Sequence, residues 1–87
     1  MNESQKEIFS IAQEECAEVI QAISKIQRFG IESEHNGVTN RAHLEEEVGD
    51  LLCMIHLMQS YGLVDWANVE KARTKKLDKL KQWSNIK

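Results

Sequence analysis

The chain has 87 residues, no proline, four glycines and a formal net charge of −3 at pH 7. This length fits one small domain, and no apolar run approaches the ~18 residues that a membrane span requires. The first ten residues lack the apolar stretch of a signal peptide, and Cys16 and Cys53 without such a signal favour reduced thiols in the cytoplasm over a disulfide.

The charge is divided unevenly along the chain. Residues 1–50 contain eleven Asp/Glu and four Lys/Arg, a balance of −7, whereas residues 51–87 contain three and seven, a balance of +4. The acidic total disfavours nonspecific binding to nucleic acid, because phosphate groups repel a negative surface. We therefore expect neither nucleic acid nor a membrane as a partner.

The absence of proline and the abundance of good helix formers predict an all-α chain with no room for strands. Periodicity predicts a first helix over about Asn2–Phe29, with Ser4 and Glu7 as a capping box and Gly30 at its end. The polar stretch 30–39 has two glycines and no periodicity, and is predicted to be a loop.

A second helix is predicted to begin at Thr39 or Asn40, both good N-caps, and to end at Tyr61. A third is predicted from the N-cap Asp65 to about Trp83. Residues 1–87 are thus expected to form a single domain of two long antiparallel helices and a C-terminal helix. Because three helices leave an apolar face uncovered, two copies are expected to complete a four-helix bundle core by dimerisation.

Acidic residues interrupt the apolar faces of the first two helices. On the first helix, Glu18 lies at the edge of the apolar stripe, and Glu15 lies within about 60° of Ile8, Ile11, Ala12, Val19, Ala22 and Ile26. On the second, Glu47 and Asp50 share one stripe with Leu44, Leu51, Met54, Met58 and Tyr61. Each helix therefore carries an acid-x-x-acid pair on the face that should be buried.

Four carboxylates on apolar faces are unfavourable unless a cation neutralises them, and neither stripe contains Lys or Arg. Oxygen ligands suit Mg²⁺ or Mn²⁺. One such pair is usually a solvated surface, but two on successive helices favour a metal site made of Glu15, Glu18, Glu47 and Asp50. Gly49, inside the second helix, is expected to let another group approach the second pair.

The sequence pattern indicates no catalytic or metal-binding role for the cysteines and histidines. The C-x-x-H of Cys53 and His56 lacks the second pair of ligands that a zinc site needs, so packing or surface positions are expected. Cys16 is expected to be a small buried residue, and His35 and His43 to be solvated.

Three residues leave a choice between a structural role and contact with a ligand. Trp66 and Trp83 could stack on a base, but packing in the core or a dimer interface is favoured. Asn40 could bind a base edge, but a helix cap is favoured.

The acidic pattern resembles that of the MazG-like all-α nucleoside triphosphate pyrophosphohydrolases, which carry EExxE on one helix and ExxD on the next. Here the motifs read Glu14-Glu15-Cys16-Ala17-Glu18 and Glu47-Val48-Gly49-Asp50. The likeness extends over residues 19–30, 51–58 and the basic tail 76–83, and is greatest to short, single-domain members of phage type or stand-alone type.

The resemblance implies hydrolysis of a (deoxy)nucleoside triphosphate to its monophosphate and pyrophosphate, with Mg²⁺ held by Glu15, Glu18, Glu47 and Asp50. It also implies a homodimer or homotetramer. Water would attack phosphorus, and Glu15 and Glu18 are the preferred catalytic acceptors of its proton. Glu14 matches the first acid of the motif, but points about 100° away from Glu15.

Basic residues are needed to bind the remaining phosphate charge. Lys25 and Arg28 follow the acidic pair on the first helix, and the third helix offers Lys76 and Lys79. These four are the candidate phosphate ligands, with Arg41 as a further candidate.

Other functions fit the same residues. A phosphoribosyl-ATP pyrophosphohydrolase-like enzyme would share the fold and size, although the stretches KIQRFG and KLDKLKQW favour the MazG-like assignment. A non-catalytic helical dimerisation module could bind nucleotide or metal without turnover. In a purely structural hairpin, the acids would meet basic residues of a partner chain.

Overall fold

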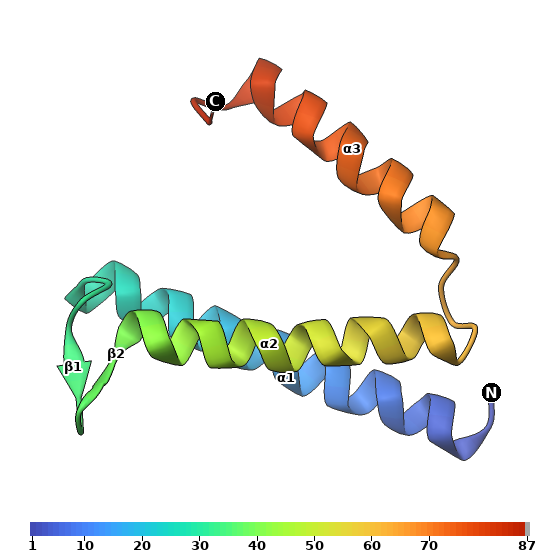
Figure 1. Cartoon of the computed structure of the whole chain (residues 1–87), viewed down its shortest axis with the longest axis horizontal. Helices are drawn as coiled ribbons and strands as arrows, with labels where there is room; N and C mark the ends of the chain where they lie inside the picture. The colour runs from blue at the N-terminus through green and yellow to red at the C-terminus, as the bar shows by residue number, and fades with distance from the viewer. Residues whose placement is uncertain (87) are drawn as a thin grey trace.

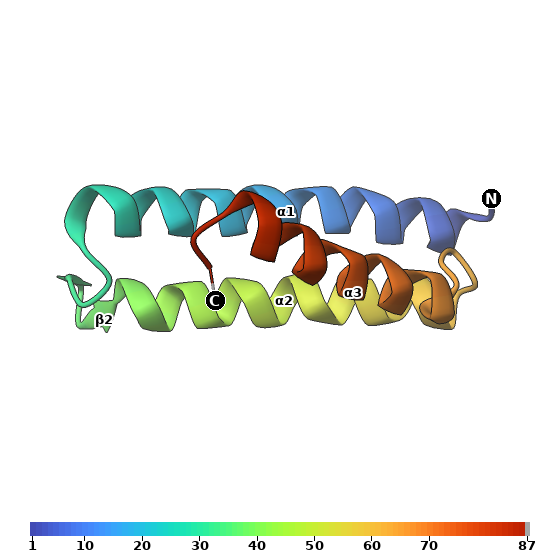
Figure 2. The same cartoon turned by 90° about the horizontal axis from the view of Figure 1, so that it is seen from above.

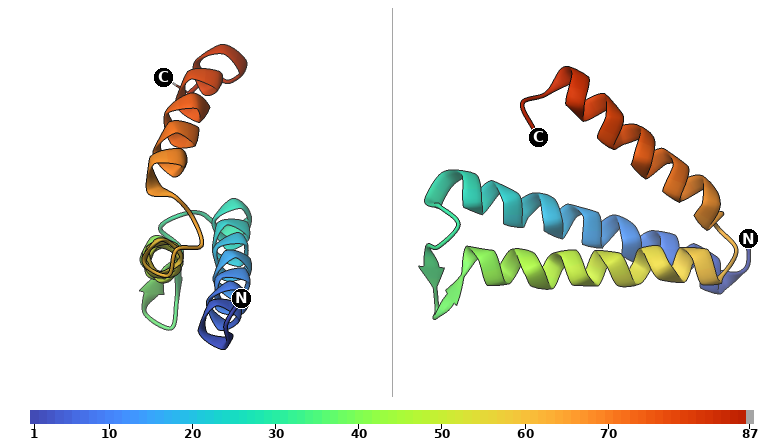
Figure 3. Two further views of the ribbon diagram at one scale, coloured as in Figure 1. Left: turned by 90° about the vertical axis from the view of Figure 1, so that its right-hand side faces the viewer. Right: turned by 45° about the horizontal axis from the view of Figure 1, so that its top comes forward.

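The computed structural model describes residues 1–86, and over this range the predicted three-helix, all-helical architecture is confirmed. The elements in chain order are α1 (Glu3–Phe29), β1 (Glu34–His35), β2 (Val38–Thr39), α2 (Asn40–Ser60) and α3 (Trp66–Trp83) (Figure 1). Figure 2 shows α1 and α2 side by side along their length, as an antiparallel hairpin. Figure 3 shows α3 diverging from this hairpin after the turn that follows α2.

The first helix begins where predicted, but its capping box lies two residues earlier than expected. The Asn2 side chain accepts a hydrogen bond from the Gln5 amide at 2.8 Å, and the Gln5 side chain accepts one from the Asn2 amide at 3.0 Å. The prediction of Ser4 and Glu7 as the capping box is therefore wrong, because the helix already begins at Glu3. Its predicted end is confirmed: Gly30 has a φ of 97° and donates to the Ile26 carbonyl at 2.8 Å.

The connection between α1 and α2 contains a short hairpin, so the expectation of a loop without strands is wrong. β1 and β2 pair antiparallel, with His35 opposite Val38. Between them Asn36 and Gly37 have φ values of 54° and 80°. Two central residues with positive φ form the tight turn that matches the twist of a β-hairpin, and Asn-Gly is its strongest local signal.

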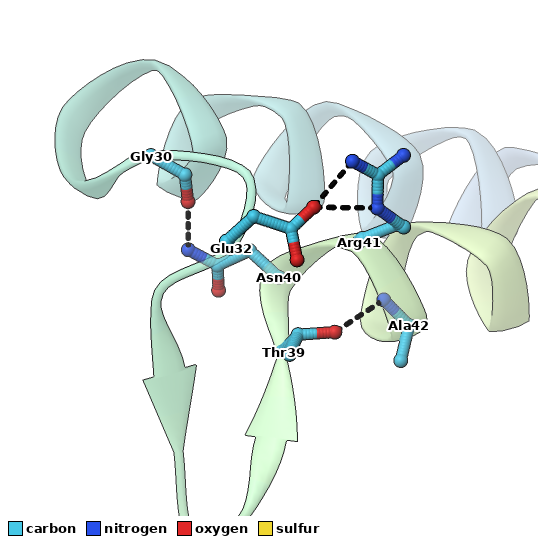
Figure 4. Close-up of polar contacts among 6 residues, drawn as sticks. All are labelled: Gly30, Glu32, Thr39, Asn40, Arg41 and Ala42. Carbon is cyan, nitrogen blue, oxygen red and sulfur yellow. Dashed lines mark hydrogen bonds and ion pairs between the residues drawn. The ribbon is translucent and has the colours of Figure 1, made fainter.

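Hydrogen bonds fix the start of α2 to the end of α1 (Figure 4). Thr39 is the N-cap, as predicted, since its hydroxyl accepts from the Ala42 amide at 3.0 Å. Asn40 has a different role from the cap expected for it: its Nδ2 donates to the Gly30 carbonyl at 2.9 Å. This bond sets which turns of the two helices face each other.

The core is small and lies within the hairpin. Its buried apolar residues are Ile8, Ala12, Ala22 and Met54. The partly buried side chains of Ile11, Leu57, Met58 and Leu63 pack against the cluster of Ile8, Ala12 and Met54. The chain exposes 6847 Å², whereas a compact monomer of 10.0 kDa exposes about 5,200 Å². Its radius of gyration is 15.8 Å, compared with about 12 Å for a compact domain of this length.

The third helix makes little contact with the hairpin. It begins after Asp65, whose carboxylate accepts from the Ala67 amide at 2.9 Å, and ends at Trp83, as predicted. None of its residues is buried. Trp66 packs edge-on against His56, with ring centroids 5.7 Å apart, at the base of the helix. Among the described residues, no helix has both the length and the apolar character to cross a membrane.

Gly49 provides a test of the space around α2. An added Cβ there would meet nothing within 4 Å, so no group of residues 1–86 makes the close approach expected at this glycine. Gly49→Ala should raise the free energy of unfolding by about 0.5–1 kcal/mol, because alanine loses less backbone entropy in a helix. Urea denaturation measures this, with Gly37→Ala as a control that should destabilise at its φ of 80°. A loss of stability in Gly49→Ala would contradict the open environment.

Candidate metal and substrate site

Three carboxylates meet between the middle of α1 and the middle of α2. One oxygen each of Glu15, Glu47 and Asp50 lies within 4.8 Å of the others. Glu15 and Glu47 are half-buried, and Asp50 is exposed. The antiparallel hairpin produces this group, because it places one turn of α1 beside the turn of α2 that carries both of the other acids.

The structure brings together three of the four predicted metal ligands. Glu18 is half-buried one turn further along α1, but it lies outside the group of three. Glu14 is exposed, about 100° around the helix from Glu15.

The group concentrates negative charge, and no Lys or Arg of residues 1–86 is paired with it. Partial desolvation raises the pKa of Glu15, and the nearby carboxylates of Asp50, Glu47, Glu18 and Glu14 raise it further. Three oxygen donors with unbalanced charge are the chemistry that suits a hard divalent cation.

His43 is a neighbour of this group that the sequence analysis missed. Its Nε2 lies 3.4 Å from Oε1 of Glu47, and the two side chains are only 29% and 12% exposed. The expectation of a solvated His43 is therefore wrong, although the i, i+4 spacing on α2 was visible in the sequence. The imidazole of His43 therefore lies beside one carboxylate oxygen of Glu47, at the edge of the acidic group.

The raised pKa of Glu15 predicts a pH dependence of the metal-free protein. The unfolded chain loses the Glu15 proton near pH 4.5, whereas the folded chain retains it to higher pH. Because the folded state then binds more protons, the contribution of Glu15 to stability is present at low pH. That contribution is lost as pH rises from about 4.5 through the raised value.

Thermal unfolding in EDTA between pH 4 and 8 measures this loss, with Glu15→Gln as the matched variant. We expect the variant to lose less stability than the natural chain over this range. If the melting temperatures of the two proteins changed with pH in parallel, the raised pKa of Glu15 would be contradicted.

The four candidate phosphate ligands do not join the acidic group within a single chain. Lys25 lies nearer the closed end of the hairpin, where it lines two clefts. Arg28 places its guanidinium carbon 5.2 Å from the centre of the Phe29 ring. Lys76 and Lys79 are exposed on α3, which stands away from the hairpin (Figure 1).

The further cation considered from sequence, Arg41, already has a carboxylate partner. Its guanidinium contacts Oε1 of Glu32 through two nitrogens, with an Nε distance of 2.7 Å (Figure 4). This pair links α2 to the connection after α1.

The cysteines and tryptophans lie outside the acidic group. Both cysteines are free and exposed; the expectation that Cys16 is buried is wrong for the single chain. His56 is exposed and contacts Trp66, whereas Trp83 is almost fully exposed at the end of α3. No zinc-type group of Cys and His occurs among residues 1–86.

The architecture is thus that of an all-helical protein with an acidic group between two antiparallel helices. The chain matches the family model of the MazG nucleotide pyrophosphohydrolase domain over residues 3–83. Since the match spans almost the whole chain, the protein belongs to the MazG family, whose activity indicates a nucleotide hydrolase. The acidic group agrees with the divalent-metal dependence general among MazG-type enzymes. Neither the curated proteins nor the solved structures contain a match.

Proposed function

We propose that this protein hydrolyses a (deoxy)nucleoside triphosphate between its α- and β-phosphates, giving the monophosphate and pyrophosphate, with Mg²⁺ as the metal. The observation that carries the proposal is the group of Glu15, Glu47 and Asp50, with their oxygens within 4.8 Å and no Lys or Arg partner in residues 1–86. The family assignment supplies the class of substrate.

These three residues are proposed as metal ligands, with Glu18 as a fourth from the next turn of α1. When bound, a divalent cation neutralises charge on phosphate oxygens and lowers the pKa of a coordinated water. Glu15 and Glu18 are the proposed acceptors of the proton of the attacking water, because Glu15 belongs to the acidic group and Glu18 lies one turn away from it on α1. His43 is proposed to orient Glu47.

Two exposed apolar stripes support a homodimer as the working unit. They follow the 3–4 residue spacing of a helix face, with the exposed Phe9, Cys16, Ile20 and Ile23 on α1 and the exposed Val48 and Leu52, followed by the half-buried Ile55, on α2. Ile20 is 67% exposed and Leu52 47%. Each stripe is rotated by about 100° from the face between the helices. Because the helices are antiparallel, these rotations bring both stripes to the same side of the hairpin.

The surface area supports the same assembly. The single chain exposes about 1,600 Å² more than a compact monomer of its mass, from 6847 Å² against about 5,200 Å². A stable interface removes about 800 Å² from each partner. Pairing of two hairpins through their stripes would complete the expected four-helix core, and pairing of two dimers would give a tetramer.

The third helix is proposed to pack on the partner's hairpin. An isolated helix of 18 residues is marginal in water, and no residue of α3 is fully buried in the single chain. It carries six Lys/Arg and two Asp/Glu, a balance of +4, whereas residues 1–60 carry four and eleven, a balance of −7. Packing between subunits would bring Lys76 and Lys79 toward the partner's acidic group, as phosphate ligands together with Arg28.

The decisive experiment is a panel of nucleoside triphosphates assayed for pyrophosphate with Mg²⁺, Mn²⁺ or EDTA. We expect metal-dependent release of pyrophosphate with the monophosphate as co-product. Phosphoribosyl-ATP in the same panel tests the related enzyme. Absence of turnover across the panel would overturn the proposal, and metal-dependent nucleotide binding without product would instead indicate a non-catalytic module.

A further inference from the structure

Two adjoining clefts open at the closed end of the hairpin, where the connection after α1 folds back. Their volumes are about 380 and 280 Å³. Lys25, His35 and Asn40 line both, Phe29 lines only the larger, and His43 only the smaller. Side chains from α1, β1 and α2 therefore converge on one hollow, which the acidic group does not share.

Backbone hydrogen bonds hold the walls of the clefts in place. The Asn40 amide donates to the Ser33 carbonyl at 2.9 Å, and the Arg41 amide donates to the Ile31 carbonyl at 2.9 Å. The Asn40 side chain adds its bond to Gly30 (Figure 4). The hollow is thus formed before any ligand enters, as is usual for small-molecule sites.

The side chains that line the clefts combine an aromatic face with polar groups. Phe29 is 63% exposed, and Arg28 lies near its ring. Asn40 uses its Nδ2 for Gly30, while its Oδ1 accepts no hydrogen bond within residues 1–86. Lys25 has no ion-pair partner in that part of the chain. An aromatic platform with one free acceptor and a free cation suits a flat, polar heterocycle and the sugar attached to it.

The smaller cleft leads toward the acidic group. His43, which lines it, contacts Glu47 at 3.4 Å. Along α2, Asn40 and Glu47 are seven residues apart, a rise of about 10 Å. Ribose and base together bridge such a length from a phosphate group. One ligand can therefore occupy the clefts and still place its phosphates at the carboxylates.

We propose that these clefts bind the nucleoside part of the substrate, with Phe29 stacking on the base and Lys25 and Asn40 bonding to its polar edge or to the sugar. The inference rests on the proposed function for the position of the phosphates. Recognition of the nucleoside does not itself require turnover.

Calorimetry in Mg²⁺ tests the proposal with two kinds of probe. The α,β-methylene analogues of dATP, dGTP, dCTP and dUTP carry a nucleoside and cannot be cleaved at that bond, whereas inorganic tripolyphosphate carries only phosphates. We expect at least one analogue to bind the natural protein about tenfold more tightly than tripolyphosphate, which corresponds to one stacked base. Phe29→Ala should remove most of this difference and leave tripolyphosphate binding unchanged.

Matched variants separate recognition from folding. Ile31→Ala truncates an exposed apolar side chain of the same connection that lines neither cleft, and should keep the preference. Phe29→Tyr retains the aromatic face and should also keep the preference for the analogue over tripolyphosphate. NMR of the unmutated protein gives a second readout: the analogue, but not tripolyphosphate, should shift the signals of Lys25, Phe29 and His35.

The outcomes test the proposed nucleoside site separately from the proposed reaction. The nucleoside site would be overturned if the natural protein bound all probes with equal affinity. It would also be overturned if Phe29→Ala lowered the affinity for the analogues and for tripolyphosphate by the same factor. A preference that depends on Phe29, together with no pyrophosphate release in the separate assay, would support the nucleoside site and overturn the proposed function.

Discussion

Glu47→Gln is expected to lower the rate of pyrophosphate release by at least about 100-fold, because replacing even the outer partner of a metal ligand costs up to that much. The substitution keeps the size and most of the packing of the side chain, but removes one negative charge from the group that it forms with Glu15 and Asp50. Asp50→Asn should behave in the same way. The defect should lie in metal binding, since a neutral amide is a poor ligand for a hard cation.

The same substitution should not unfold the protein. Glu47 contributes to the raised pKa of Glu15, so its neutralisation relieves repulsion in the metal-free state. Manganese binding followed by electron paramagnetic resonance, thermal unfolding and the pyrophosphate assay together separate loss of metal from loss of fold. Glu45→Gln is the matched control, because Glu45 is exposed on the same helix and lies outside the group. Normal manganese affinity in Glu47→Gln would contradict the proposed ligand role.

Leu52→Lys is expected to dissociate the proposed dimer and to lower the helical content of the chain. Leu52 lies in the exposed stripe of α2, where a second copy would bury the introduced ammonium group without a partner. Once the partner leaves, α3 has no surface to pack on, and a free 18-residue helix is only marginally stable. Loss of assembly should therefore appear as loss of helix.

Sedimentation equilibrium and far-ultraviolet circular dichroism measure these two effects. The natural chain should sediment at a multiple of 10.0 kDa, and the variant at 10.0 kDa with a weaker helical signal. Ile31→Lys places the same charge on another exposed apolar residue, away from both stripes, and should leave the assembly intact. A natural chain that sediments as a fully helical monomer would contradict the proposed interface.

Local signals in the sequence predicted the ends of the helices well. Gly30, Thr39 and Asp65 act at the expected boundaries, because a cap depends on only a few neighbouring backbone groups. The start of α1 was predicted to within one residue, but its capping box was assigned to Ser4 and Glu7, whereas Asn2 and Gln5 form it. The Asn36-Gly37 turn was a readable hairpin signal that helical composition obscured.

The acidic group shows which features of a site helical periodicity can predict and which it cannot. A helical wheel gives the direction of each side chain, and it placed Glu15, Glu47 and Asp50 toward the facing helix. It does not give the offset of one helix along another, so Glu18 seemed equivalent to Glu15 although only Glu15 joins the group. The path of α3 could not be predicted either, because it depends on contacts that the single chain does not make.

The bond between the Asn40 side chain and the Gly30 carbonyl has a consequence for changes in chain length. Between those two residues the chain leaves the helices and returns, so residues added at the Asn36-Gly37 tip would lengthen the hairpin without moving α2. One residue added just after Asn40 would instead advance the rest of α2 by about 1.5 Å and rotate it by about 100°. Glu47 and Asp50 would then turn away from Glu15. Insertions and deletions should therefore be tolerated at the tip and be damaging within the first turns of α2.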